Sequence, residues 1–527
     1  MKNTDLKSKV VSAAVWVTAI SAVGKLLGLM RESSLANYFG ASVATDAFKV
    51  AFNIPDIIIG IFGAAIVQTF IPVYNETLQK GDEKESQRFL NNFFTISLLI
   101  SLIIMTVGVF ASSFLVRLIA PGMDEVTANC AAQLAVIMMP GAVFMIMANI
   151  ATGYLQAHGR FIAAALTWYF YNLFMIGSMV FFHRMGINAV GVGALLGIAS
   201  MLLVQLPSMK KEGLRYRPVI DFKDKGLRTI GFLLGPVLIS SAFNQVYIII
   251  NRMLASGLDK GSISSMDYAY RVNVLYYTIF ILSISSVVYP LMARYGDNLG
   301  KFTGLVAKTL RVVTFVSLPI SVLFFILRFP ILQLLFQRGA FSSSDTARTA
   351  VALAGFSVGI IGTAYRDILN RAFYALKDTR TPMINGVIAI ILNIGLNLIL
   401  IRFGIVGLAL GSSIAATISA GMLIARLKSK VGKIQGNRIF DGFYKSALAS
   451  LIMGICVYFI ESQLTGRLHL YGSFIKLSIN LTASILGAGL VYTAVLFILR
   501  VEELQEGFLM IKNKVSSILL KKSGETI

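Results

Sequence analysis

The sequence predicts an all-α polytopic membrane protein of about fourteen spanning helices. Hydrophobic residues make up 56% of the 527 residues and charged residues only 14%, whereas a soluble chain carries about a quarter charged residues. Apolar stretches of roughly 20 residues, the length that a bilayer core demands, recur from one end of the chain to the other. No polar segment is long enough for a separate soluble domain, so we expect one membrane domain.

Each predicted span is an apolar stretch bounded by polar residues. The spans lie near residues 10–33, 45–74, 89–116, 127–152, 161–182, 187–207, 229–255, 265–293, 304–327, 346–370, 382–401, 404–425, 443–462 and 474–499. The first span follows a short basic segment and lacks a small-residue cleavage site after a short apolar core. We therefore expect a retained helix rather than a signal peptide.

The polar connections divide these spans into groups. The predicted organisation is an N-terminal lobe of six helices, a basic inter-lobe linker, a C-terminal lobe of six helices, a basic loop with two further helices, and a tail: residues 1–207, 208–228, 229–425, 426–499 and 500–527. The charged, amphipathic tail is expected to lie on the membrane surface.

Three short motifs indicate an internal repeat. Residues 68–72, 153–157 and 190–193 resemble residues 286–290, 373–377 and 406–409, in that order. The members of each pair lie about 218 residues apart, so helices one to six correspond to helices seven to twelve. An even number of helices per repeat gives two pseudo-symmetric lobes of the same orientation, an arrangement typical of transporters that bind substrate at the repeat interface and work by alternating access.

The net charge of +22 reflects topology rather than a nucleic-acid partner. When the N-terminus is placed in the cytoplasm, most of the 47 Lys and Arg residues fall on the cytoplasmic side of the predicted spans. This asymmetry is what the positive-inside rule describes, and it predicts that both termini are cytoplasmic. The same basic loops favour contact with anionic lipid head groups.

No enzyme or metal-site motif occurs in the sequence. Cys130 and Cys456 stand in apolar surroundings, and His158, His183 and His469 form no cluster with metal-ligand spacing. The chain also lacks a nucleotide-binding loop, a catalytic triad and a paired-acid motif. We therefore expect neither an enzyme nor an ATP-driven pump, and no metal or cofactor of its own.

Ionisable side chains inside the predicted spans are candidate functional residues, because such groups usually face a protein interior or a watery cavity. Lys25, Arg31 and Glu32 lie in the first span, Asp46 begins the second, and Arg271 lies in the eighth. The basic residues predict a cationic cavity for a phosphate-bearing substrate, since the planar fork of Arg binds phosphate oxygens in pairs. The alternatives are snorkelling at helix ends or pairing within the protein, and Asp46 is either a gate partner of Arg31 or a helix-start cap.

Asn393 and Asn397 lie one turn apart, and so on one face, in the eleventh predicted helix. Their amide groups either help to coordinate a small cation or hydrogen-bond to neighbouring helices.

The sequence resembles the MurJ (MviN) family of bacterial lipid II flippases, within the multidrug/oligosaccharidyl-lipid/polysaccharide exporter superfamily. The resemblance rests on residues 24–32, 39–48 and 51–55, with support from 120–122, 335–341 and 372–382. It covers nearly the whole chain, and the family also has fourteen helices.

The resemblance implies a flippase that moves an undecaprenyl-pyrophosphate-linked peptidoglycan precursor across the bacterial cytoplasmic membrane, with cell-wall synthesis proteins as further partners. The substrate-binding residues that it implies are Arg31, Arg271 and Lys25, with Asp46 and Glu32 as acidic neighbours. It also locates a sodium site near the seventh, eleventh and twelfth helices. The matching positions there are Asn244, Asn393, Asn397 and Thr417, all neutral. Neutral residues make coupling to sodium doubtful, and coupling to the membrane potential is the alternative.

The chain departs from the family pattern at three places. Lys25 stands where the family has Arg, and Glu32 stands where it usually has Asp. The second helix carries no charge at residues 57–63, around Ile59, where the family often has a functional Arg. This leaves open a paralogue for another polyprenyl-linked glycan, such as an exopolysaccharide or teichoic acid precursor.

Two other classes of protein are weaker alternatives. A cation-coupled small-molecule exporter would favour an acidic cavity, whereas the charges inside the spans are mainly basic. A non-transporting scaffold would tolerate loss of Arg31 or Arg271.

Overall fold

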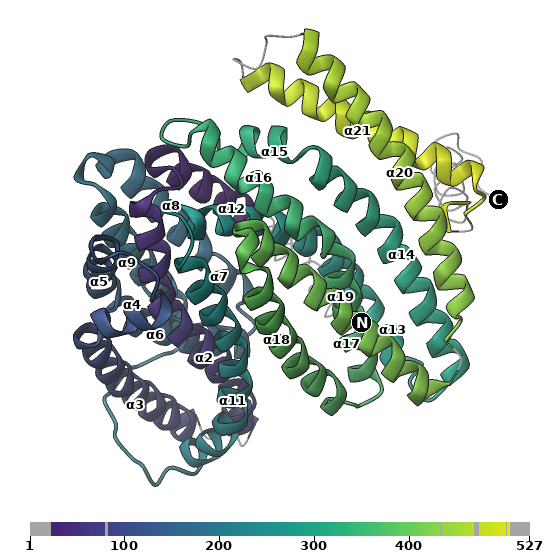
Figure 1. Cartoon of the computed structure of the whole chain (residues 1–527). Coiled ribbons are helices and arrows are strands. Elements are labelled where there is room, and N and C mark those ends of the chain that lie inside the picture. Colours follow the sequence, from purple (N-terminus) through teal and green to yellow (C-terminus); the bar gives the residue numbers. More distant parts are fainter. Residues whose placement is uncertain are drawn as a thin grey trace, which may run out of the picture. The chain divides into compact units, whose positions relative to one another are not determined.

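A computed structural model describes residues 20, 23–79, 83–432, 434–467, 474–501 and 503–505 of the chain. Within these ranges every regular element is helical, and none is a strand (Figure 1). The predicted all-α fold class is confirmed. The start of the first predicted span and nearly all of the predicted tail 500–527 lie outside the described residues.

The described part of the chain holds nine helices that are long and apolar enough to cross a membrane, or eleven if two bent helix pairs each count as one span. The first predicted span begins outside the described residues, and α2 (Val43–Gln79) and α11 (Lys225–Ser256) contain residues whose side chains are not described. The protein is thus a multi-pass membrane protein, and the total of fourteen helices stays a prediction.

The chain forms two compact units. The first comprises Met1–Ser265 and Phe336–Asp345. Its helices after the helical residues 23–39 are α2, α3 (Glu83–Phe110), α4 (Ser112–Ile119), α5 (Glu125–Met138), α6 (Gly141–Ala157), α7 (Phe161–Ala165), α8 (Thr167–Phe182), the 3₁₀ turn η1 (His183–Met185), α9 (Ile187–Leu203), α10 (Leu206–Lys211) and α11.

The second unit comprises Met266–Leu335 and Thr346–Ile527. It takes in most of α12 (Ser262–Tyr276), the π-helix η2 (Tyr277–Ile281), α13 (Leu282–Arg294), α14 (Leu299–Ile326), α15 (Arg328–Leu335), α16 (Ser343–Val358), α17 (Ile360–Ala375), α18 (Arg380–Leu400), the 3₁₀ turn η3 (Ile401–Phe403), α19 (Ile405–Val431), α20 (Gly436–Arg467) and α21 (Phe474–Ile498). The predicted boundaries of the lobes describe a sequence repeat, which this division by contacts does not test.

The internal repeat is visible as a matching order of elements. The pair α5 and α6 is bent by 44°, and the pair α16 and α17, about 218 residues later, is also bent by 44°. The long helix α3 is followed by the short helix α4, just as α14 is followed by α15. The two halves of the chain therefore repeat the same breaks as well as the same helices.

A glycine with a positive φ ends each of two equivalent 3₁₀ turns. Gly186 follows η1 with φ +78° and ψ −168°, and Gly404 follows η3 with φ +67° and ψ −143°. Only glycine occupies this part of conformational space without strain, because a Cβ atom would clash with the backbone. Each glycine lets the chain reverse at once into the next helix, α9 or α19.

Stacked aromatic rings form the core of the first unit. Phe70 of α2 lies 5.1 Å from Tyr74 and 5.2 Å from Phe93 of α3, measured between ring centroids. Burial of large rings supplies most of the packing energy available to such a cluster. Gly153 of α6 lies against this stack, where a Cβ atom would come within 3.0 Å of the Phe70 ring. One of the repeat motifs found in the sequence is therefore a close-packing position.

The predicted linker 208–228 is shorter in the structure and is bound to α3. Helices α10 and α11 extend into it from both ends, which leaves residues 212–224 outside helices. Asn92 of α3 donates to the Asp221 carbonyl and accepts from the Asp221 N–H, both at 2.8 Å. Asn91 donates to the Arg215 carbonyl at 3.1 Å. These side chains form hydrogen bonds with backbone N–H and C=O groups of the linker, which have no partner within a helix.

The last two helices belong to the second unit, where α20 packs along α14 and α21 packs on α20 (Figure 1). Their apolar contact with α14 and α15 includes Leu327, Met453, Leu481 and Leu496, all buried. Beyond α21, Glu503 pairs with the buried Arg311 of α14, with 2.8 Å between Nε and Oε1.

Candidate functional site

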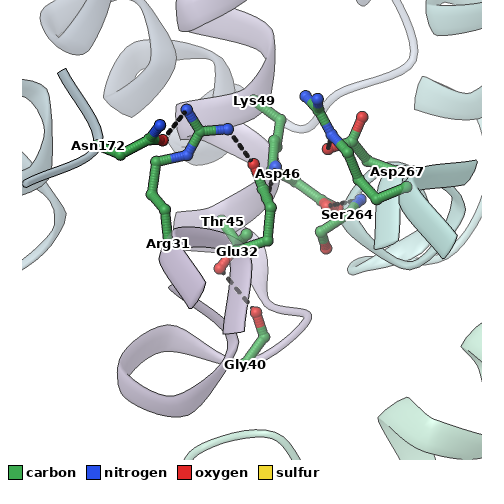
Figure 2. Close-up of polar contacts among 10 residues, drawn as sticks. Arg31, Glu32, Gly40, Thr45, Asp46, Lys49, Asn172, Ser264 and Asp267 are labelled. Atoms are coloured by element: carbon green, nitrogen blue, oxygen red, sulfur yellow. Dashed lines mark hydrogen bonds and ion pairs between the residues drawn. The ribbon is translucent and has the colours of Figure 1, made fainter. Parts of the chain in front are cut away.

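Arg31 is held from three directions in the first unit. Its Nη2 lies 2.6 Å from Glu32 Oε1, and its Nη1 donates to the side-chain oxygen of Asn172 at 3.2 Å (Figure 2). Its guanidinium carbon lies 5.1 Å from the centre of the Tyr171 ring. Tyr171 and Asn172 are neighbours on α8. This one helix therefore supplies the ring that lies against the face of the guanidinium group and the hydrogen bond at its edge. These contacts fix the plane of the guanidinium group, as bidentate recognition of an anion requires.

Glu32 joins two cations. Its Oε1 contacts Arg31, and its Oε2 lies 2.5 Å from Nζ of Lys49 on α2. The exposed fractions of these side chains are 14% for Arg31, 5% for Glu32 and 6% for Lys49. Because buried charges are stable only when paired, the carboxylate holds both basic groups in place. The three side chains together carry one net positive charge.

The turn before α2 explains why residues 32 and 49 meet. Gly40 has φ +65°, and the Thr45 hydroxyl donates to the Gly40 carbonyl at 2.8 Å. The Ser42 hydroxyl donates to the Phe39 carbonyl at 2.7 Å. This turn reverses the chain within a few residues, so the end of the helix over residues 23–39 and the start of α2 lie side by side.

Asp46 caps the start of a helix, although not that of its own helix α2. Its two carboxylate oxygens accept hydrogen bonds from the backbone N–H groups of Gly261, at 2.6 Å, and Ser264, at 2.7 Å. Those N–H groups belong to the start of α12. The first N–H groups of a helix have no carbonyl partner within it, and they and the helix dipole both favour an anion there. Both oxygens of Asp46 are therefore engaged by α12.

Arg271 lies in the second unit, on α12. Its Nε is 3.7 Å from Oδ2 of Asp267, one helical turn earlier. Its side chain is 44% exposed, whereas that of Asp267 is 10% exposed, so Arg271 is far more accessible than Arg31. Lys25 is also exposed, on the helix that carries Arg31. Of the predicted substrate-binding residues, the first unit brings Arg31 and Glu32 into direct contact.

Two residues of this cluster were missing from the sequence prediction. Lys49 follows Asp46 by three residues on α2, and Asn172 is a polar residue in the fifth predicted span. The one available signal was that both are polar groups inside apolar helices. Their partners Glu32 and Arg31 lie 17 and 141 residues away in sequence, and no helical spacing connects them.

Hydrogen bonds within α18, within α19 and between these two helices occupy the predicted cation site. Asn393 donates to the Ser412 hydroxyl at 3.0 Å, and Asn397 donates to the Asn393 carbonyl oxygen at 3.2 Å. The Thr417 hydroxyl donates to the Ser413 carbonyl at 2.9 Å. The side chain of Asn244 lies outside the described part of the structure. The bond from Asn393 to Ser412 is of the kind that joins neighbouring helices.

A second polar cluster lies inside the second unit around Asp367 of α17. Its carboxylate lies 3.0 Å from Nε of Arg371, accepts from the Tyr277 hydroxyl at 2.9 Å, and also accepts from the Ser285 hydroxyl. Tyr277 begins the π-helix η2, and such a wide turn often marks a functional position. Within this cluster, the sequence alone indicates one contact: Asp367 and Arg371 are four residues apart and therefore lie on the same face of a helix.

Asp378, in the loop between α17 and α18, is a carboxylate with several bonded partners outside the spans. Lys430 of α19 lies 2.5 Å from its Oδ2, and Thr381 donates to it through its N–H and its hydroxyl. The hydrogen bond from Lys430, assisted by those from Thr381, lowers the pKa of Asp378 from 3.8 to about 2. At the matching positions of the first unit, Arg160 lies 2.6 Å from Glu212. Both halves therefore have an ion pair here, with Arg160 in the place of the acidic Asp378 and Glu212 in the place of the basic Lys430.

Among the residues that the structure describes, no three His, Cys, Asp or Glu side chains could share a metal ion.

Two helical repeats with a cationic cluster inside the first unit are the arrangement of a membrane transporter. An inward-facing multidrug transporter of the MATE family in the exporter superfamily named above has the same fold, with a TM-score of 0.67 and 15% identity over 80% of this chain and 99% of that one.

The chain belongs to the MurJ family of lipid II flippases. The family model for lipid II flippase MurJ matches residues 35–479. A probable lipid II flippase MurJ of Buchnera aphidicola is 30% identical over 92% of this chain and 96% of its own length. A lipid II flippase MurJ solved in an inward closed conformation has a TM-score of 0.78 and 26% identity, covering 92% of this chain and 98% of that one.

Proposed function

We propose that this chain moves lipid II, the undecaprenyl-pyrophosphate-linked peptidoglycan precursor, from the inner to the outer leaflet of the bacterial cytoplasmic membrane by alternating access. Family membership supports the substrate. The observation that carries the residue-level proposal is the Arg31 guanidinium, which Asn172, Tyr171 and Glu32 hold in one plane inside the first unit. An Arg fork held in this way suits the oxygens of a pyrophosphate.

Arg271 and Lys25 are the other cations that we assign to the pyrophosphate. Both are exposed, and Nε of Arg271 lies 3.7 Å from Oδ2 of Asp267. A long exposed cation moves with an anionic substrate at little energetic cost, because its side chain is not packed. We propose that these two residues meet the substrate early and that Arg31 holds it.

We propose that both termini are cytoplasmic, because that orientation puts most of the 47 Lys and Arg residues on the inner side. The basic surface then faces the anionic lipids of the inner leaflet. Contact with cell-wall synthesis proteins would bring the substrate to the same side.

Energy coupling is assigned here to the charge of the substrate and the membrane potential rather than to a bound cation. The Asn393 and Asn397 amide groups both make hydrogen bonds within the second unit. A sodium ion at that position would bind amide oxygens, and the Asn393 oxygen already accepts a hydrogen bond from Asn397. No metal or organic cofactor is part of the proposal.

Complementation of bacteria depleted of their own lipid II flippase tests this function. Wild type is expected to restore growth, whereas Arg31→Ala and Arg271→Ala, matched for membrane expression, are expected to fail. Arg184→Ala in the exposed turn η1 is the matched control and should restore growth. If well-expressed wild type fails to rescue, the chain moves another polyprenyl-linked glycan; if both cavity variants rescue, the assigned residues are wrong.

A further inference from the structure

A cavity of about 500 Å³ lies at one end of two neighbouring spans of the first unit. The helical stretch Phe161–Met185, which includes α7 and α8, and the stretch Ile187–Lys211, which includes α9 and α10, are each long and apolar enough to cross a membrane. Residues at the start of the first stretch and at the end of the second line the cavity. The cavity therefore lies at a boundary between the apolar interior and the polar surface of the bilayer.

Three side chains that can donate hydrogen bonds line this cavity. Ser208 and Lys211 lie on α10, and among the described residues neither side chain has a hydrogen-bond or ion-pair partner. Arg160 contacts Glu212 through its Nε, at 2.6 Å, which leaves the Nη groups of its guanidinium as donors. Arg160, Lys211 and Glu212 together carry one net positive charge, which matches the single negative charge of a phosphodiester.

The rest of the cavity wall is apolar. Phe161 and Ile162 line it and are 46% and 43% exposed. Side chains at intervals of three or four residues continue this apolar surface along the span: Ile162, Leu166, Phe170 and Leu173. This spacing puts them on one face of a helix, and each is at least partly exposed. The cavity thus joins a cationic pocket to an exposed apolar stripe, which suits a lipid with an anionic head group and acyl chains.

We propose that this cavity binds the phosphodiester head group of an anionic phospholipid, with Ser208, Lys211 and Arg160 as donors to the phosphate and the acyl chains along α7 and α8. A pyrophosphate carries more negative charge than the cavity offsets, which favours a phospholipid over the transported substrate. The proposal deepens the contact with anionic lipids that belongs to the proposed function, because it gives that contact a defined site. This site shares no residue with the cluster around Arg31.

Quenching of tryptophan fluorescence tests the site in the full-length protein. The chain has two tryptophans, so Trp16→Phe leaves Trp168, which is 49% exposed and lies two residues after Leu166. The protein is placed in phosphatidylcholine nanodiscs with a small fraction of either brominated phosphatidylglycerol or brominated phosphatidylcholine. Bromine atoms on acyl chains quench a tryptophan that they contact. Brominated phosphatidylglycerol is expected to quench Trp168 more strongly than the brominated neutral lipid at the same fraction.

Two adjacent lysines of α10 provide the variant and its control. Lys211→Met should lower the preference for phosphatidylglycerol by about fivefold, the value of one basic residue at an anionic lipid surface. Lys210→Met removes the same charge from an exposed neighbour that does not line the cavity, and it should keep the preference of the parent. Equal quenching of the parent by the two brominated lipids overturns the proposal. Equal losses in both lysine variants also overturn it, since they would show general attraction to the surface.

Competition with unbrominated lipids identifies the source of the phosphate. Lipid II should displace brominated phosphatidylglycerol no better than the same amount of unbrominated phosphatidylglycerol does. If lipid II displaces it at a far lower amount, the cavity is a substrate site and the assignment to a phospholipid is wrong. The quenching requires no transport, so its failure is distinct from a failure of wild type to rescue bacteria that lack their own flippase.

Discussion

The hydroxyl of Tyr492 on α21 donates to the backbone carbonyl of Phe315 on α14, at 3.0 Å. Pro319, four residues after Phe315, has no N–H group, so this carbonyl lacks its usual partner within the helix. A buried carbonyl without a donor is costly, and α21 supplies the missing one. The contact between α21 and α14 therefore lies where Pro319 removes one backbone hydrogen bond from α14.

Removal of the Tyr492 hydroxyl should loosen the last two helices. We expect Tyr492→Phe to lower the stability by about 1 kcal/mol, the typical value of one hydrogen bond, in thermal unfolding of the purified protein. Pro319→Ala restores an N–H for Phe315 and should shrink this loss in a double-mutant cycle. Tyr444→Phe, at an exposed position of α20, should leave stability unchanged. Equal losses with and without Pro319 would contradict the explanation.

Replacement of Arg31 by Lys should impair transport although the charge is kept. Lysine has a compact ammonium group, so it cannot contact Glu32, Asn172 and the Tyr171 face together as the fork of Arg31 does. We expect Arg31→Lys to reduce the initial rate of lipid II translocation in vesicles to about a tenth of wild type or less. Asn172→Ala, which leaves the charge and the ring contact intact, should cause a smaller loss. Wild-type rates in Arg31→Lys would show that only the charge matters.

Variants at position 46 should decrease in stability in the order wild type, Asp46→Asn, Asp46→Ala. Asp46→Ala removes both acceptors for the Gly261 and Ser264 N–H groups, and the loss of a helix cap costs about 1 kcal/mol. Asp46→Asn keeps one side-chain oxygen and should fall between Ala and wild type. Thermal unfolding at neutral pH measures the order. An Asn variant that is less stable than the Ala variant would refute the capping role.

The ion pair of Asp378 and Lys430 should contribute stability only above the pKa of Asp378. The pKa is about 2 in the folded protein and 3.8 in the unfolded reference, so the pair stabilises the fold above about pH 4, and this contribution is lost as the pH falls from there to about 2. Melting temperatures of wild type and Asp378→Asn should therefore differ at pH 7 and converge as the pH falls to about 2. A difference that is independent of pH would contradict this assignment.

Two glycines that are equivalent in the repeat should resist substitution equally. Gly186→Ala and Gly404→Ala place a Cβ atom on a backbone with positive φ, and each should cost about 1–3 kcal/mol from backbone strain alone, since nothing lies within 4 Å of either added atom. Gly395→Ala, in the middle of α18 and also in open space, should be neutral or slightly stabilising. Thermal unfolding of the three variants gives the comparison, and tolerance of Ala at Gly404 would disprove the strain.

Much of the fold was readable from the sequence, because the bilayer imposes a length and a composition on every span. Helices were expected at residues 229–255 and 404–425, and α11 and α19 occupy them with somewhat longer ends. The bends within the spans were not expected. The 44° bend between α5 and α6 leaves the apolar pattern unbroken, so hydropathy carries no trace of it.

The sequence by itself determined the membrane class, the repeat and the presence of basic residues such as Arg31 inside the spans, because apolar length, motif spacing and intramembrane charge are properties of a linear chain. Only the tertiary structure decided which groups are partners: Glu32 holds Lys49 as well as Arg31, and Asp46 binds the start of α12. The partners are 17 and 218 residues apart in two of these contacts. Packing of helices brings such residues together, and periodicity within one helix does not encode it.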